Sequence, residues 1–144
     1  MSNWHQRFLE VAEIISTWSK DPSTKVGAVI VDRKRRVVSH GYNGFPRGVR
    51  DDASRYADRE TKMEMVVHAE ANAILNAKGA DLEGTTLYCT FFPCPHCAAL
   101  IIQAGISTVI ATPREADGRY EPRFQISRQM FREAGIVFHE GRNV

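Results

Sequence analysis

The chain has 144 residues, 43% of them hydrophobic and 25% charged, which is ordinary for a folded protein, so we expect one domain spanning 1–144. Its 19 basic and 17 acidic residues give a net charge of +2, which argues against the basic face of a nucleic-acid-binding protein. The lack of a long apolar run or a secretory signal excludes a membrane protein, and an odd cysteine count argues against a disulfide scaffold, so we expect a cytoplasmic location.

The first part of the chain predicts a helix, a hairpin and a long connection. Apolar residues recur at helical spacing over 4–18, and Pro22 ends this helix because the residue before a proline disfavours the α conformation. Two β-rich runs, 26–31 and 36–40, follow, and the polar residues between them indicate a hairpin turn. The stretch 43–65 is rich in glycine, proline, aspartate and arginine, and loops of this length are usually functional or disordered.

The rest of the chain alternates helices with strands. We expect helices, each followed by a glycine suited to a left-handed cap, over 68–77, 94–104 and 123–134. We expect strands over 85–90, 108–111 and 136–139. This alternation predicts an α/β fold in which helices cover both faces of a sheet.

Two short motifs fall at the starts of predicted helices and carry metal-binding side chains. His68 and Glu70 form the first, while Cys94 and Cys97, spaced i and i+3, project from one face of the second helix. One imidazole and two thiolates suit Zn²⁺ with one coordination position left open. Water at such a position has a pKa near neutrality, and Glu70 is placed beside it without being needed as a ligand. The motifs therefore predict one catalytic zinc ion per chain.

Two other interpretations of the cysteines remain open. A Cys-x-x-Cys pair that follows aromatic residues also resembles the redox pair of thioredoxin-like oxidants, and bound zinc rather than a reducible disulfide would separate the two. A purely structural zinc site would need a fourth protein ligand, for which the candidates are Cys89, His96 and His139. Cys89 lies in an apolar strand, where a free thiol usually fills the core, and both histidines are typical of surface positions.

Longer runs around the motifs extend the pattern. They are Ser-Lys-Asp-Pro-Ser at 19–23 with Val-Gly-Ala-Val-Ile at 26–30, Gly-Tyr-Asn-Gly-Phe-Pro at 41–46, Val-His-Ala-Glu-Ala at 67–71 and Phe-Pro-Cys at 92–94. Over residues 15–112 the chain resembles the deoxycytidylate (dCMP) deaminase family. The resemblance implies a cytidine-deaminase-like three-layer fold, with a central five-stranded mixed sheet flanked by helices. It also implies zinc-dependent hydrolysis of dCMP to dUMP and ammonia, a step that supplies precursors of dTTP.

The resemblance also implies roles for single residues. The three predicted ligands match the family's zinc ligands, and Glu70 matches its proton shuttle. Asn43 matches the asparagine that hydrogen-bonds the sugar, and the backbone at Ala69 and Pro93 lies where the family reads the pyrimidine edge.

Cations near the first strand are candidates for holding the 5′-phosphate of such a substrate. Lys20, Ser23 and Lys25 cluster there, in a run that matches the family. A phosphate is best held by cations and backbone N–H groups. Further arginines lie in loops that could close over the same end, namely Arg47, Arg50, Arg114 and Arg119.

The family's regulation implies further ligands and partners. Members with Gly-Tyr-Asn-Gly often bind dCTP as an activator and dTTP as an inhibitor, so Tyr42 and Gly44 are candidate effector contacts, and Mg²⁺ would accompany a triphosphate. The family's habit also implies a homo-oligomer, with a hexamer favoured over a dimer or tetramer.

Departures from the family pattern bear on the substrate. An aromatic residue is common where 62–65 reads Lys-Met-Glu-Met, Asn-Glu is frequent where 95–96 reads Pro-His, and 114–122 has no family counterpart. They leave another or modified cytosine nucleotide, or a nucleoside, as alternative substrates. A nucleic-acid editor similar to tRNA adenosine deaminases is a further alternative, which Phe-Pro-Cys at 92–94 and the small net charge disfavour.

Overall fold

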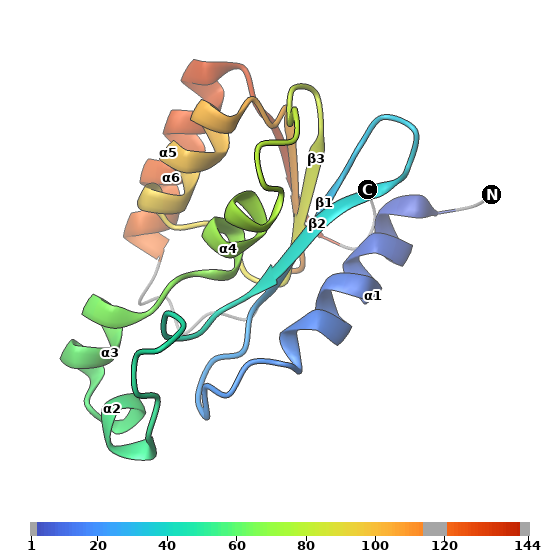
Figure 1. Cartoon of the computed structure of the whole chain (residues 1–144). Helices are drawn as coiled ribbons and strands as arrows, with labels where there is room; N and C mark the ends of the chain where they lie inside the picture. Colours follow the sequence, from blue (N-terminus) through green and yellow to red (C-terminus); the bar gives the residue numbers. More distant parts are fainter. Residues whose placement is uncertain (1–2, 114–120, 142–144) are drawn as a thin grey trace.

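Five strands form one mixed sheet in the computed structural model, which describes residues 3–113 and 121–141 (Figure 1). In chain order they are β1 (Gly27–Val31), β2 (Val37–Tyr42), β3 (Thr86–Cys89), β4 (Thr108–Ala111) and β5 (Val137–Glu140). The spatial order is β2-β1-β3-β4-β5. β1 pairs antiparallel with β2 and with β3, whereas β3, β4 and β5 are parallel. The expected five-stranded mixed sheet is confirmed.

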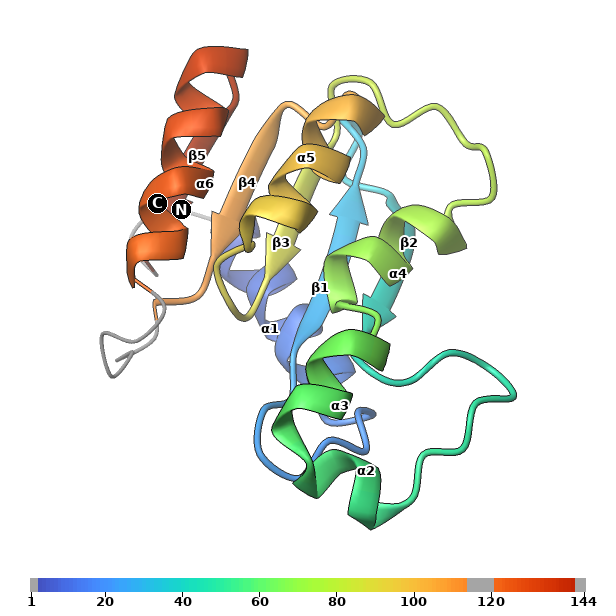
Figure 2. The same ribbon diagram turned by 90° about the vertical axis from the view of Figure 1, so that its left-hand side faces the viewer.

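Helices cover both faces of this sheet, as expected. The described helices are α1 (Trp4–Ser16), α2 (Ala53–Ala57), α3 (Arg59–Met65), α4 (Ala69–Asn76), α5 (Pro95–Ala104) and α6 (Glu121–Ala134). α1 lies alone on one face, and α4, α5 and α6 lie side by side on the other (Figures 1 and 2). α2 and α3 extend beyond one end of the sheet. No helix in 3–113 or 121–141 is long and apolar enough to cross a membrane.

The two cores follow from the alternation of side chains along each strand. Val29 and Val31 of β1 pack with Tyr88 of β3 against α1. Ala28 and Ile30, one residue out of phase, point to the opposite face and join the larger core under α4, α5 and α6. Side chains from both layers are fully buried, so the sheet is the rigid centre on which the helices rest.

Two glycines let helices approach the sheet closely. A β-carbon at Gly27 would lie 2.1 Å from the Ala12 carbonyl oxygen of α1. A β-carbon at Gly41 would lie 2.4 Å from the Ala73 nitrogen and 2.5 Å from the Ala69 carbonyl oxygen of α4. Backbone atoms cannot give way as a flexible side chain can, so glycine at 41 fixes how near the first turn of α4 lies to β2.

The expected elements all occur, with ends shifted by at most two residues. The stretch 43–65 differs most, because α2 and α3 interrupt what was expected to be an irregular loop. Asp52 and Asp58 cap these helices by accepting hydrogen bonds from the Arg55 and Thr61 N–H groups. Both helices are too short to display an apolar period, so the periodicity that predicted the other helices gives no signal here.

Candidate metal centre and substrate pocket

His68, Cys94 and Cys97 meet at the starts of two neighbouring helices. His68 is the N-cap of α4 and Cys94 is the N-cap of α5, with Pro95 in the first turn where its missing N–H costs nothing. The Nδ1 atom of His68 lies 3.5 Å from the Cys94 Sγ atom and 3.4 Å from the Cys97 Sγ atom. All three ligand atoms lie within 4.8 Å of one another. The structure thus joins two motifs that are 26 residues apart.

The donor set fits a tetrahedral zinc ion. With Zn–S near 2.3 Å and Zn–N near 2.05 Å, tetrahedral geometry places a nitrogen and a sulfur ligand about 3.5 Å apart. The two observed distances agree with this value. Within the part of the chain that the structure describes, Cys89, His96 and His139 do not join the group, so three protein ligands leave one position open.

The electrostatics of the cluster favour one anionic sulfur, that of Cys94. Hydrogen bonds from Cys97 and His68 lower the pKa of the Cys94 thiol to about 3, although burial opposes them. The pKa of Cys97 is raised because its thiol hydrogen-bonds to Cys94 and is buried. The positive ends of α4 and α5 point at the same place and favour negative charge there. A divalent cation would hold both sulfurs as thiolates.

Glu70 lies in the first turn of α4, next to the metal ligands. Its side chain is buried, with 4% of the residue exposed. Burial raises the pKa of the Glu70 carboxyl, and the neighbouring His68 and Cys97 partly offset this effect. A carboxyl whose pKa is moved upward from its usual acidic range is suited to both accepting and donating a proton.

A pocket opens over this cluster, and its walls come from several elements. His68, Ala69, Glu70 and Cys94 form its floor. One wall is largely polar and comprises Asp21, Thr24, Val26 and Asn43. The remaining walls combine aromatic and cationic side chains, which are Phe91, Phe92 and Phe124 with Arg59, Lys62 and Arg123.

The structure brings some predicted substrate residues to the pocket and leaves others away from it. Asn43 and Ala69 line it. Lys20 is exposed and forms an ion pair with Asp51, with its Nζ atom 3.1 Å from the carboxylate. The ammonium group of Lys25 donates to the Ser19 carbonyl instead of facing the pocket.

Other predicted residues are not among the described residues that line the pocket. Pro93 is fully buried, and the Ser23 hydroxyl accepts a hydrogen bond from Lys62. Tyr42 ends β2 with 41% of its surface exposed, and Gly44 forms an isolated bridge with Val67. The predicted roles of these residues stay predictions. Arg114 and Arg119 lie outside the described residues.

Sequence reasoning missed the cations that do line the pocket. Arg59 and Lys62 belong to α3, which the sequence did not predict, and Arg123 follows an unmatched segment at the start of α6. The signal in the sequence for Lys62 is its place in the run that precedes His68.

Known proteins match the chain over most of its length. Residues 2–112 match the model of the cytidine and deoxycytidylate deaminase zinc-binding region, which includes all four motif residues. The chain belongs to this deaminase family. Membership, together with the histidine seated against both cysteines, rules out the thioredoxin-like interpretation.

Relatives and solved structures agree with this assignment. The chain is 49% identical over 138 residues to an uncharacterised deaminase from the luxG 3′ region of Aliivibrio fischeri, covering 94% of this chain and 92% of the relative. It is 42% identical over 142 residues to mouse deoxycytidylate deaminase, covering 95% of this chain and 79% of the relative. The structure of cyanophage S-TIM5 dCMP deaminase in complex with dCMP and dUMP superposes with a TM-score of 0.72 at 26% identity, covering 94% of each chain. The expected cytidine-deaminase-like fold is confirmed.

Proposed function

We propose that this protein hydrolyses dCMP to dUMP and ammonia. The observation that carries the proposal is a buried carboxylate, Glu70, beside three donors that would hold zinc, at a pocket that Glu70, His68 and Cys94 line. Its relatives include deoxycytidylate deaminases, and a protein of the same fold has been solved with dCMP and dUMP.

Glu70 would move the protons of the reaction. Zinc, held by His68, Cys94 and Cys97, supplies Lewis acidity that makes water reactive at neutral pH. Glu70 would accept a proton from the attacking water and pass protons to N3 of the cytosine ring and to the amine that leaves C4. The overall change adds one water and releases one ammonia. Burial of the carboxyl supports this role, because an elevated pKa lets it return each proton it takes.

The pocket walls support a nucleotide rather than a free base. Phe91 and Phe124 offer apolar surface for a pyrimidine ring. Asn43 lines the pocket, and its match to the family asparagine supports a contact with the sugar. Arg59 and Arg123 add positive charge at the pocket, and charge-assisted hydrogen bonds to phosphate are the stronger kind. These cations replace Lys20 and Lys25 as our candidates for the 5′-phosphate.

Ammonia release from a panel of compounds tests the proposal. The panel contains dCMP, CMP, 5-methyl-dCMP, deoxycytidine, cytosine and AMP. We expect the highest kcat/KM for dCMP, at least about tenfold above deoxycytidine, since one charge-assisted contact contributes that much. Equal rates for deoxycytidine and dCMP would contradict the phosphate site. Inosine formation in tRNA, with no reaction on free nucleotides, would favour the editor alternative.

Assembly and regulation follow from the proposal as separate expectations. We propose a homo-oligomer, with a hexamer favoured, and a single monomeric mass in light scattering at assay concentration would contradict it. We also propose that dCTP with Mg²⁺ activates and dTTP inhibits, through a site that includes Tyr42 and Gly44. Kinetics in dCMP that are hyperbolic and unaffected by either triphosphate would argue against effectors. A cytoplasmic location remains our expectation.

A further inference from the structure

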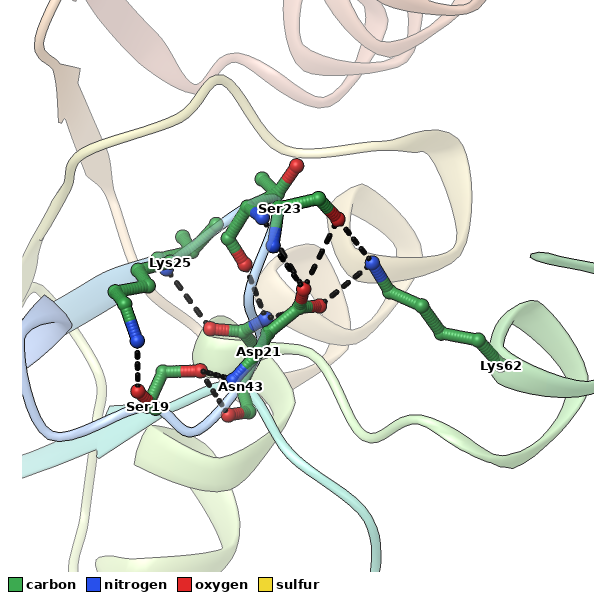
Figure 3. Close-up of polar contacts among 8 residues, drawn as sticks. Ser19, Asp21, Ser23, Lys25, Asn43 and Lys62 are labelled. Carbon is green, nitrogen blue, oxygen red and sulfur yellow. Dashed lines mark hydrogen bonds and ion pairs between the residues drawn. The ribbon is translucent and has the colours of Figure 1, made fainter. Parts of the chain in front are cut away.

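A buried ion pair lies on the polar wall of the pocket. Asp21 is 0% exposed, and its Oδ2 atom lies 2.7 Å from the Nζ atom of Lys62, whose side chain is 12% exposed (Figure 3). The pair joins the segment after α1 to α3, across 41 positions of the sequence. Replacing such a pair by apolar residues is often neutral or stabilising, so stability alone does not account for it.

The two oxygen atoms of the Asp21 carboxylate accept hydrogen bonds from different donors. Oδ1 accepts the N–H of Ser23 at 2.9 Å, the hydroxyl of Ser23 at 3.1 Å and the N–H of Thr24 at 3.1 Å. Oδ2 accepts from Lys62 and, at 3.4 Å, from the Asn43 side-chain amide. Lys62 also donates to the Ser23 hydroxyl at 2.9 Å. The ion pair therefore holds in place the loop of residues 21–24, which contacts Asn43 (Figure 3).

The hydrogen bonds of the Asn43 side chain can be counted completely. Its Nδ2 group donates to the Thr24 carbonyl at 2.9 Å and to Asp21, which uses both of its N–H bonds. Its Oδ1 atom accepts the Val26 N–H at 2.8 Å. An amide has two donors and two acceptor lone pairs, so one lone pair on Oδ1 is left. Asn43 lines the pocket, and toward a ligand it can act only as an acceptor.

We propose that Asp21 and Lys62 are positioning residues that fix the Asn43 amide as a hydrogen-bond acceptor for the sugar of the substrate. They act directly through the Asp21–Asn43 contact. They act indirectly by holding Thr24, whose carbonyl accepts a hydrogen bond from the Asn43 side-chain amide. This inference rests on the proposed function. A 2′-deoxynucleoside 5′-monophosphate has a single sugar hydroxyl, at the 3′ carbon, so that hydroxyl is the donor Asn43 selects.

Asp21→Asn is the informative substitution, because it replaces one carboxylate oxygen by an NH₂ group and keeps the shape of the side chain. The three donors around Oδ1 require an oxygen there, so the new NH₂ group replaces Oδ2. It then faces two other donors, the Lys62 ammonium and the Asn43 amide. Donors that face each other cannot bond, so the Asn43 amide keeps only its hydrogen bonds to Thr24 and from Val26 and is held less firmly.

The readout is the preference for the 3′ hydroxyl, measured as kcat/KM for dCMP divided by kcat/KM for 2′,3′-dideoxycytidine 5′-monophosphate. We expect Asp21→Asn to lower this ratio roughly tenfold through a higher KM for dCMP, the size of one hydrogen bond. Lys62→Met should lower it in the same direction by less. The double variant Asp21→Asn/Lys62→Met removes both buried charges and should fold even where a single variant does not, with the ratio still lowered.

Asp32→Asn is the matched control. Asp32 also accepts backbone N–H groups in a turn and pairs with a cation, Arg36, but it lies in the β1–β2 hairpin away from Asn43. We expect its ratio to equal that of the unsubstituted protein.

Three outcomes would overturn the inference. One is an unchanged ratio in the Asp21 and Lys62 variants. Another is an equal loss on both substrates, which indicates a general structural role or direct contact of Lys62 with the substrate. The third is an unsubstituted protein that deaminates both substrates equally well. An unsubstituted protein that does not deaminate dCMP removes the proposed function and this inference with it, which is a separately recognisable result.

Discussion

The inner and outer walls of the pocket are held in different ways. The inner wall is the floor described above and comprises the first turns of α4 and α5. It rests on the sheet through apolar side chains and the close approach at Gly41. The outer wall, which comprises Asp21, Thr24 and Asn43 with Arg59 and Lys62 of α3, is held by hydrogen bonds and by the Asp21–Lys62 ion pair. Close packing tolerates little displacement, whereas a polar network can be altered one contact at a time. We infer that the inner wall sets the chemistry and the outer wall the choice of substrate.

Loss of an inner-wall ligand should have the largest effect. Cys97→Ala leaves two donors for zinc, so we expect metal content far below one ion per chain and activity below about one thousandth of normal. Metal analysis by mass spectrometry and an ammonia assay measure both. Cys89→Ala is the matched control, because it removes a buried thiol that is not among the ligands. It should keep zinc and cost only about 1 kcal/mol of stability. A Cys97→Ala protein that retains one tightly bound zinc would contradict the ligand assignment.

Glu70→Gln should separate metal binding from proton transfer on the same wall. The amide cannot shuttle protons, so we expect kcat to fall about 10²–10⁴-fold while zinc content stays near one per chain. Glu10→Gln, an exposed residue of α1, provides the control for the loss of one carboxylate. Near-normal turnover in Glu70→Gln would remove Glu70 from the mechanism.

Gly41→Ala should displace the first turn of α4 from the side of β2, without changing any side chain that lines the pocket. The added methyl group would meet the backbone of α4 at 2.4 Å, so the helix must move and carry His68 and Glu70 with it. We expect a loss of at least about 2 kcal/mol in unfolding free energy, with reduced kcat. Gly44→Ala, where no atom lies within 4 Å of the new methyl group, is the stability control. Equal melting temperatures for the two variants would refute a fixed spacing between α4 and β2.

The outer wall should give the smallest effect, visible as a dependence on pH. Burial would raise the pKa of Asp21, but hydrogen bonds from Lys62, Ser23 and Thr24 outweigh it and the pKa is lowered. A carboxyl with a lowered pKa stabilises the fold above its ordinary pKa of about 3.9, and this contribution fades as pH falls through the folded value. We expect the gap in unfolding free energy between the unsubstituted protein and Asp21→Asn to narrow below pH 3.9. Urea unfolding from pH 6 to pH 3 measures it, and a constant gap would contradict the shift.

The same division explains which parts of the molecule could be predicted from sequence. The inner wall is encoded locally, since His68 to Glu70 and Cys94 to Cys97 each fall within one helical turn that a short motif reveals. The outer wall depends on contacts between distant residues, such as Asp21 with Lys62, and on α3, which is too short to show a period. Residue type identified Lys20 and Lys25 as cations but not their direction, and both side chains point to partners outside the pocket.

The strand order has a consequence for how the protein acquires its metal. Strand β1 pairs with the central strand β3, so Val31 lies beside Thr86, 55 positions later in the chain. Loops this long must close before the core can form, and folds dominated by such distant pairings fold slowly. His68 lies inside the 31–86 loop that this pairing closes and the two cysteines lie beyond it, so the folded sheet is what holds the three donors together. Metal acquisition should therefore follow folding, and the rate of refolding should not depend on zinc concentration.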